Sequence, residues 1–248
     1  MRNAQFALRV ALLAIVFAEP SAHCAVPTEN SSCDRVVQSI LHGQYARALA
    51  QLDGAPSEGR TEAERANLRG LALILGGDAK KSIDEFNTAL ELQPTMSEAH
   101  LNRGVAFLQL GDYVHASRDF ETVWSDPKSL LRARAAYHDA LAMDALHRPQ
   151  DAESWINRAL EADPSLDDAL LFSALLRERR GDVQGAGKAY KSFLDRHPDS
   201  VVAMLRFAIT AQRAGFADTA RAYLQKVVDA APSSSEAEEA RKFLVMWE

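Results

Sequence analysis

The chain has 248 residues, of which 47% are hydrophobic and 25% are charged, and its formal net charge is -6. This share of apolar residues is enough for a buried core and excludes an intrinsically disordered chain. The negative net charge, and the lack of any run rich in Lys and Arg, argue against nucleic acid as the main partner.

The first 25 residues follow the pattern of a secretory signal peptide. Arg2 and Arg9 form a basic start, and an apolar stretch runs from Val10 to Ala18. Because a membrane span needs about 20 apolar residues, this stretch is too short to cross a bilayer but fits a secretory leader. We therefore expect residues 1–25 to be removed and the mature protein to be periplasmic or secreted, with no transmembrane segment. The alternative is an uncleaved apolar start of an N-terminal helix.

Cys24 and Cys33 are the two cysteines of the chain. Cleavage after Ala18 would keep both, and an oxidising compartment could then join them, whereas cleavage after Ala25 would leave Cys33 alone. A lipid on Cys24 would instead anchor the protein to a membrane. That alternative has a weak basis, because a lipobox has a small residue before its cysteine and this chain has His23. Neither cysteine has the spacing of a metal site or of a redox CxxC motif.

Beyond the leader, glycines recur at a fixed period. Three of the four intervals are 34 residues, and the remaining one, 70 residues, equals two periods plus a two-residue insertion. His147 stands where the missing glycine is expected. A period of about 34 residues in a helical pattern predicts stacked helical hairpins. The glycines are Gly43, Gly77, Gly111, Gly181 and Gly215.

Each hairpin has small residues where its two helices must approach. In the first helix these are Gly70, Gly104, Ala140, Ala174 and Ala208. In the second helix a small residue precedes a large apolar one by four positions, so that both lie on one face. These pairs are Ala48/Leu52, Ser82/Phe86, Ala116/Phe120, Ala152/Ile156, Ala186/Tyr190 and Ala220/Leu224. The recurrent glycine should end the first helix in a left-handed conformation. A proline should end each hairpin, at Pro94, Pro127, Pro164, Pro198 and Pro232.

This order of small, aromatic and proline positions resembles the tetratricopeptide repeat (TPR). The resemblance implies an all-α TPR superhelical solenoid of about six helix-turn-helix repeats, closed by a C-terminal capping helix. The expected divisions are a signal peptide at 1–25, an N-terminal segment with a degenerate first repeat at 26–56, repeats at 63–96, 97–130, 133–166 (irregular), 167–200 and 201–234, and the capping helix at 235–248.

The resemblance also implies a peptide-binding groove, since in TPR proteins the concave wall comes mainly from the first helix of each repeat. Most of the matching positions here are apolar, which predicts a groove for an apolar helix or an extended peptide. The alternative is that these side chains pack as core against neighbouring helices. The expected groove residues are Asn67, Leu71, Ile74, Leu101, Asn102, Val105, Leu108, Arg134, Tyr137, His138, Leu141, Leu171, Leu175, Leu205 and Ile209.

Motifs for catalysis are lacking, and the seven histidines are scattered. We therefore expect a protein that is not an enzyme, with no catalytic residues, metal or cofactor, and we expect His100 to have a structural role. The leading hypothesis is a secreted or periplasmic TPR scaffold that binds a protein or peptide partner. The layout also resembles the pilotin proteins of type IV pilus biogenesis, which help secretin subunits to assemble in the outer membrane. A pilotin-like assembly factor and a regulatory subunit of an envelope enzyme complex are the alternatives.

Overall fold

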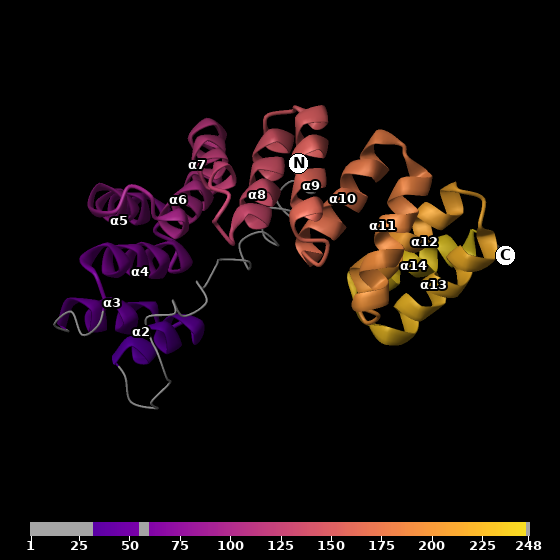
Figure 1. Cartoon of the computed structure of the whole chain (residues 1–248). Coiled ribbons are helices and arrows are strands. Elements are labelled where there is room, and N and C mark those ends of the chain that lie inside the picture. The colour runs from indigo at the N-terminus through magenta and orange to yellow at the C-terminus, as the bar shows by residue number, and fades with distance from the viewer. Residues whose placement is uncertain (1–31, 55–59, 247–248) are drawn as a thin grey trace. The chain divides into compact units, whose positions relative to one another are not determined.

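The structure, a computed structural model, describes residues 32–54 and 60–246, which form helices and the turns that join them. The expected all-α fold is confirmed (Figure 1). The expected signal peptide and Cys24 lie outside the described residues. Among the described helices, none combines the length and the hydrophobicity that a membrane span requires.

The helices follow one another along the chain with short connections. Their bounds are α2 (Ser32–Leu41), α3 (Tyr45–Gly54), α4 (Glu62–Leu75), α5 (Ala79–Leu92), α6 (Ser97–Leu110), α7 (Tyr113–Ser125), α8 (Arg132–Ala145), α9 (Pro149–Ala162), α10 (Asp167–Arg180), α11 (Val183–Arg196), α12 (Val201–Arg213), α13 (Ala217–Ala230) and α14 (Ser235–Val245).

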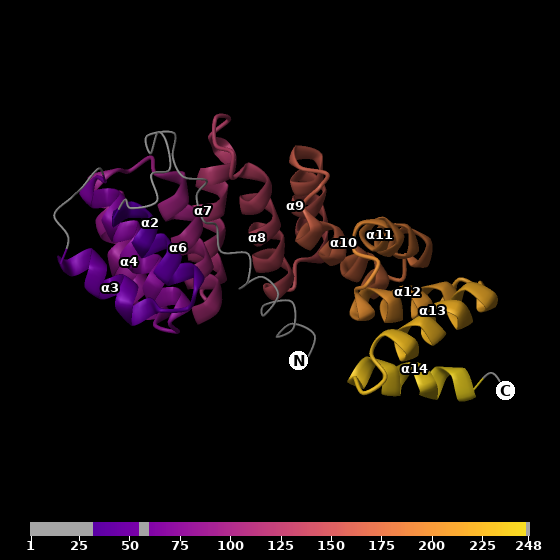
Figure 2. The same ribbon diagram turned by 90° about the horizontal axis from the view of Figure 1, so that it is seen from below.

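The chain forms two compact units, residues 1–152 and 153–248. In the first unit each helix from α2 to α8 packs against the next one in the chain. In the second unit the same holds from α10 to α14, so that α14 covers α13 (Figure 2). Each unit is thus a stack of antiparallel helices in which contacts are mainly between sequence neighbours, as expected for a helical solenoid.

The turn between the two helices of each hairpin has one geometry throughout the described chain. The five recurrent glycines have φ between 70° and 93°, and His147 has φ 59°. In every case the amide of this residue donates to the carbonyl three residues back, and the next amide donates to the carbonyl five residues back, at 2.8–3.1 Å. This pair of bonds is a Schellman motif, which closes the end of a helix. The prediction that His147 replaces a turn glycine is therefore confirmed.

Close contact between the helices of a hairpin explains the small residue in the first helix. A Cβ atom at position 104 would lie 2.5 Å from Cε1 of Phe120, and one at position 70 would lie 2.4 Å from Cε1 of Phe86. Both rings are fully buried. The glycines thus leave the space that these rings fill, as predicted. In the fifth and sixth hairpins alanine takes the same position, next to Tyr190 and Leu224.

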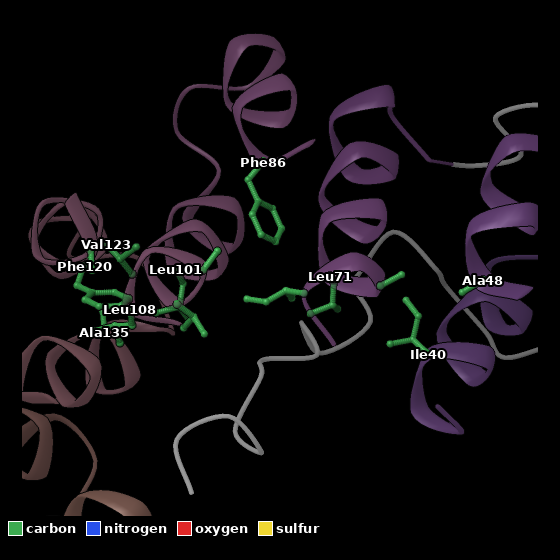
Figure 3. Packing of buried hydrophobic residues seen from close by; sticks show 14 of the residues in the cluster. Ile40, Ala48, Leu71, Phe86, Leu101, Leu108, Phe120, Val123 and Ala135 are labelled. Carbon is green, nitrogen blue, oxygen red and sulfur yellow. The ribbon is translucent and has the colours of Figure 1, made fainter. Parts of the chain in front are cut away.

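The large apolar residues of the second helices form the centre of each unit's core. In the first unit Phe86 and Phe120 pack in one continuous cluster with Ile40, Leu71 and Leu101 (Figure 3). In the second unit separate clusters surround Tyr190 and Leu224. Each second helix from α5 onward ends two residues before its proline, which agrees with the predicted role of proline as a helix stop.

The two-residue insertion lies in the connection between α7 and α8. Residues 126–131 make this connection, whereas the connections at 93–96, 163–166 and 197–200 are two residues shorter. The extra length leaves the Leu130 side chain 94% exposed. Arg132 then fixes the start of α8, because its guanidinium lies 4.4 Å from the Trp124 ring centroid and its Nε donates to the Trp124 carbonyl at 3.0 Å. The insertion is therefore absorbed in the loop without a break in either helix.

A glycine at position 147 should stabilise the protein. His147 is exposed and has the left-handed conformation, which is unfavourable by about 1–2 kcal/mol for a residue with a Cβ atom. We expect His147→Gly to raise the thermal midpoint by about 2–4 °C. Gly111→Ala, the reverse change in the third hairpin, should lower it by a similar amount. A midpoint that falls in His147→Gly would contradict this explanation of the turn.

A compensating pair of substitutions tests the helix contact. Gly104→Ala should destabilise the protein by about 1–3 kcal/mol, because the added methyl group meets the Phe120 ring. Phe120→Leu should relieve this clash and produce an Ala–Leu pair like Ala208 and Leu224 of the sixth hairpin. In a double-mutant cycle followed by urea unfolding, we expect the double variant to be more stable than the sum of the single changes by at least about 0.5 kcal/mol. Additive effects would mean that the two positions do not form a contact pair.

Candidate partner-binding surface

The expected groove residues lie on the first helices of the hairpins, but most of their side chains are buried. Leu101, for example, is fully buried in the core of the first unit. Only Arg134, Leu171 and Leu175 of the set are partly exposed. The buried members are Asn67, Leu71, Ile74, Leu101, Asn102, Val105, Leu108, Tyr137, His138 and Leu141 in the first unit and Leu205 and Ile209 in the second. For these residues the alternative of core packing describes the structure better than an exposed apolar wall.

Asn67 and Asn102 form a polar pair inside the first unit. The Nδ2 of Asn102 donates to the Oδ1 of Asn67 at 3.1 Å, and both side chains are buried. A buried amide is stabilised only when it is hydrogen-bonded, so this pair joins α4 to α6. Their side chains are therefore used to connect successive hairpins and do not project from the wall.

His138 is part of the core. Its ring is stacked on Phe120, with centroids 5.5 Å apart, and only 1% of the residue is exposed. Its Nδ1 is buried and makes no hydrogen bond within the described part of the chain. Burial, and to a smaller extent the charge of Arg134, lower the pKa of His138 to about 3. The expectation that this histidine faces the groove is therefore wrong, because its ring fills the space beside Phe120.

A buried ion-pair cluster joins α5, α6 and α7 in the first unit. Arg103 donates to both oxygens of Asp119, at 2.7 and 2.8 Å, and to the Oδ1 of Asn87 at 2.7 Å. His100 contacts Asp119 through Nδ1 and the Pro94 carbonyl through Nε2, each at 3.0 Å. Burial alone would raise the pKa of Asp119, but the hydrogen bonds from Arg103 and His100 outweigh it and lower that pKa. The expected structural role of His100 is confirmed.

In the second unit the exposed edge of α10 combines apolar and charged side chains. Leu171 and Leu175 pack against the cluster that contains Tyr190. Glu178, one turn further along α10, accepts a hydrogen bond from the Tyr190 hydroxyl at 2.8 Å and one from Arg213 at 3.3 Å. Burial, followed by the charge of Glu178, raises the pKa of Tyr190, so this hydroxyl stays protonated. Glu178 is also within 3.8 Å of Arg206, so its charge is paired with two arginines.

The described residues contain no cluster of three His, Cys, Asp or Glu side chains that could hold a metal ion. What they do contain is a series of equivalent hairpins with a common turn and a common helix contact. This geometry defines a helical-repeat scaffold. Residues 67–121 and 140–201 match the tetratricopeptide repeat family, so these hairpins are TPR repeats.

Several known proteins share this fold. PilW, described as a widely conserved type IV pilus biogenesis factor, is 18% identical and superposes with a TM-score of 0.75 over 84% of this chain and 96% of PilW. PilF of Pseudomonas aeruginosa is 15% identical, with a TM-score of 0.74 over 97% of this chain and 99% of PilF. YrrB, described as a TPR protein with an unusual peptide-binding site, is 18% identical with a TM-score of 0.57 over 84% of this chain and 97% of YrrB. At these identities the likeness concerns the fold.

A sequence relative is the Lipoprotein NlpI homolog of Haemophilus influenzae. It is 34% identical over 89 residues, which are 36% of this chain and 27% of the relative. The chain thus matches only about a quarter of the length of that protein.

The buried His138 predicts a pH-dependent loss of stability. Its folded-state pKa of about 3 lies below the unfolded value of about 6.5, so the unfolded state binds a proton first when the pH falls. The free energy of unfolding should therefore decrease as the pH falls from about 6.5 toward 3. His138 should contribute at most about 1.4 kcal/mol per pH unit to this decrease. We expect His138→Phe to reduce this slope, as measured by urea unfolding at several pH values.

The control for this experiment is His42→Gln, because His42 is exposed on the first unit. The free energy of unfolding of His42→Gln should depend on pH as steeply as that of the wild-type protein. An equal slope in His138→Phe and in the wild-type protein would contradict the assignment of a neutral, buried His138.

Proposed function

We propose that the protein is a TPR scaffold of the cell envelope that binds another protein through its repeat surface. The observation that carries this proposal is the fold likeness to PilF, which extends over 97% of this chain and 99% of PilF. Stacked helical hairpins form extended surfaces for protein partners. The likeness to YrrB, whose description includes a peptide-binding site, supports the same kind of activity.

The proposed location is the periplasm or the cell exterior. The basic and then apolar order of residues 1–25 supports export, and the sequence relative is a lipoprotein. A lipid on Cys24 would keep the protein at a membrane surface, while cleavage beyond it would release the protein. Mass determination of the mature N-terminus distinguishes the two forms.

Within each unit we expect only some of the first-helix positions to contact a partner. In the first unit the proposed groove centres on Arg134, and in the second on Leu171 and Leu175, because these side chains are partly exposed. The buried members of the set would then support the groove from beneath.

A pilotin-like assembly factor is the second candidate function. The likeness to PilW and PilF supports it, since PilW is described as a pilus biogenesis factor and both superpose over most of this chain. In that case the partner would be a secretin subunit. No comparable observation favours a regulatory subunit of an envelope enzyme complex.

Affinity capture from envelope extracts tests the proposal. The tagged protein should enrich one envelope protein reproducibly, and a secretin subunit would favour the pilotin-like function. Leu171→Ser combined with Leu175→Ser should weaken capture at least tenfold while the helical circular dichroism signal is kept. Val114→Ser, at an exposed position of α7, is the control and should capture the partner as well as the wild type.

Two outcomes would count against the proposal. If no protein is enriched over an untagged control, the scaffold function fails. If the leucine double variant captures the partner as well as wild type does, the binding function stands but this part of the groove is not used.

A further inference from the structure

The sixth hairpin differs from the second, third and fifth hairpins at the start of its second helix. In three other hairpins an aspartate follows the turn glycine and accepts a hydrogen bond from the amide three residues further on, at 2.9–3.2 Å. These caps are Asp78, Asp112 and Asp182. The sixth hairpin has Phe216 at this position, its helix has no side-chain cap, and the Phe216 residue is 62% exposed. Because a capping side chain stabilises a helix start, Phe216 is unfavourable for the fold.

A second departure replaces an ion pair by aromatic rings. In the second and third hairpins an arginine, Arg69 or Arg103, comes directly before the small residue of the first helix. Arg103 pairs with Asp119 on the second helix of its hairpin at 2.7 Å. In the sixth hairpin the two matching positions hold Phe207 and Tyr223, whose rings meet edge to face with centroids 4.7 Å apart. The contact between the two helices that is an ion pair in the third hairpin is therefore an aromatic contact in the sixth.

The third departure is Gly187, in the interior of α11. Glycine is unfavourable inside a helix. The neighbouring Gly185 has a structural reason, because a Cβ atom there would lie 2.1 Å from the Oδ2 of Asp182. At position 187 an added Cβ atom would meet only Cγ2 of Thr210, at an ordinary 3.7 Å. Packing thus does not require this glycine. The matching residues of the first three hairpins all have side chains: Leu49, Ile83 and Ser117.

All three departures line one pocket in the second unit. The pocket has a volume of about 840 Å³, and its lining residues come from α11, α12 and the start of α13. Phe207 and Phe216 are among its lining residues, and Gly187 lines it from α11 without a side chain. Positions 183, 187 and 191 all line the pocket, and eight residues of helix span about 12 Å. The pocket is therefore long enough to hold several residues of a peptide.

The charge of the lining is positive. Lys188 and Lys191 are among the lining residues, whereas no Asp or Glu is. Lys191 pairs with Asp195 on the next turn of α11. This positive edge contrasts with the net charge of -6 of the whole chain. An apolar floor with a positive edge is complementary to a segment that has an apolar side chain flanked by carboxylates.

We propose that this pocket binds a short acidic segment of a partner protein, with one aromatic or branched aliphatic side chain inserted beside Phe207 and Phe216. The inference rests on the proposed scaffold function and adds the site and the chemistry of the partner segment. It explains why two residues that are unfavourable for the fold, Phe216 and Gly187, meet at one place, since departures of this kind concentrate at functional sites.

Selection of peptides provides the test. A phage-displayed library of random peptides is selected on the purified protein, and the affinity of enriched peptides is measured by fluorescence polarisation. We expect enriched sequences with Asp or Glu around a Trp, Phe, Leu or Ile, and binding that weakens when salt is raised. Lys188→Glu should also weaken binding.

Two variants then locate the site. Phe216→Asn should lower peptide affinity at least tenfold while it raises the thermal midpoint by about 2–4 °C, because asparagine caps the helix without a new charge. Gly187→Ile, which copies the side chain at the matching position 83, should fill the pocket and lower affinity similarly. Val114→Ser, at an exposed position of α7 in the first unit, should change neither quantity.

Three results would overturn the inference: no enriched peptides, enriched peptides that lack acidic residues, or peptides that bind Gly187→Ile as tightly as the wild-type protein. Failure of the proposed pocket can be distinguished from failure of the proposed scaffold function. If the partner captured from envelope extracts binds Phe216→Asn and Gly187→Ile as it binds the wild-type protein, the scaffold function holds and the pocket is not the site.

Discussion

Every hairpin is organised by the left-handed residue that closes its first helix. Its amide and the next one donate back to the last turn of the helix, so the second helix starts at a fixed position. Only then does the small residue at position 70 or 104 lie beneath the ring of Phe86 or Phe120. His147 takes the same conformation without the freedom of glycine, which indicates that hairpin packing can impose this turn on a residue that disfavours it.

The features that could be predicted from the sequence are those decided within one hairpin. The turn residues, the small-to-large helix contact and the proline stops depend on residues close in sequence, and the period of the pattern locates them. Burial of the first-helix side chains depends on how one hairpin stacks on the next. At Leu101 or His138 the sequence pattern therefore does not distinguish a side chain exposed on the groove wall from one buried in the core. The Arg103–Asp119 pair was also not predicted from the sequence, although Arg69 and Glu85 place an arginine and a carboxylate at the same two positions 34 residues earlier.

The repeated pattern also provides an internal reference for function. Where the hairpins agree, a residue has a structural explanation. The second unit differs from the second and third hairpins at Gly187, Phe207 and Phe216, where those hairpins have a side chain, the arginine of an ion pair and a helix cap. These three positions line one apolar pocket. TPR folds have many different partners, so the fold alone does not identify this one. The departures suggest the chemistry of the partner segment more directly than the shared pattern does.

Hydrogen–deuterium exchange, measured with and without the captured partner, is the most direct test of the claim that the departures mark the binding site. We expect slowed exchange in residues 183–192 and 207–219, which line the pocket. Exchange in α5 and α7, whose hairpins keep the capped and ion-paired pattern, should not change. Slowed exchange confined to the first unit, or absent from the pocket segments, would contradict the account.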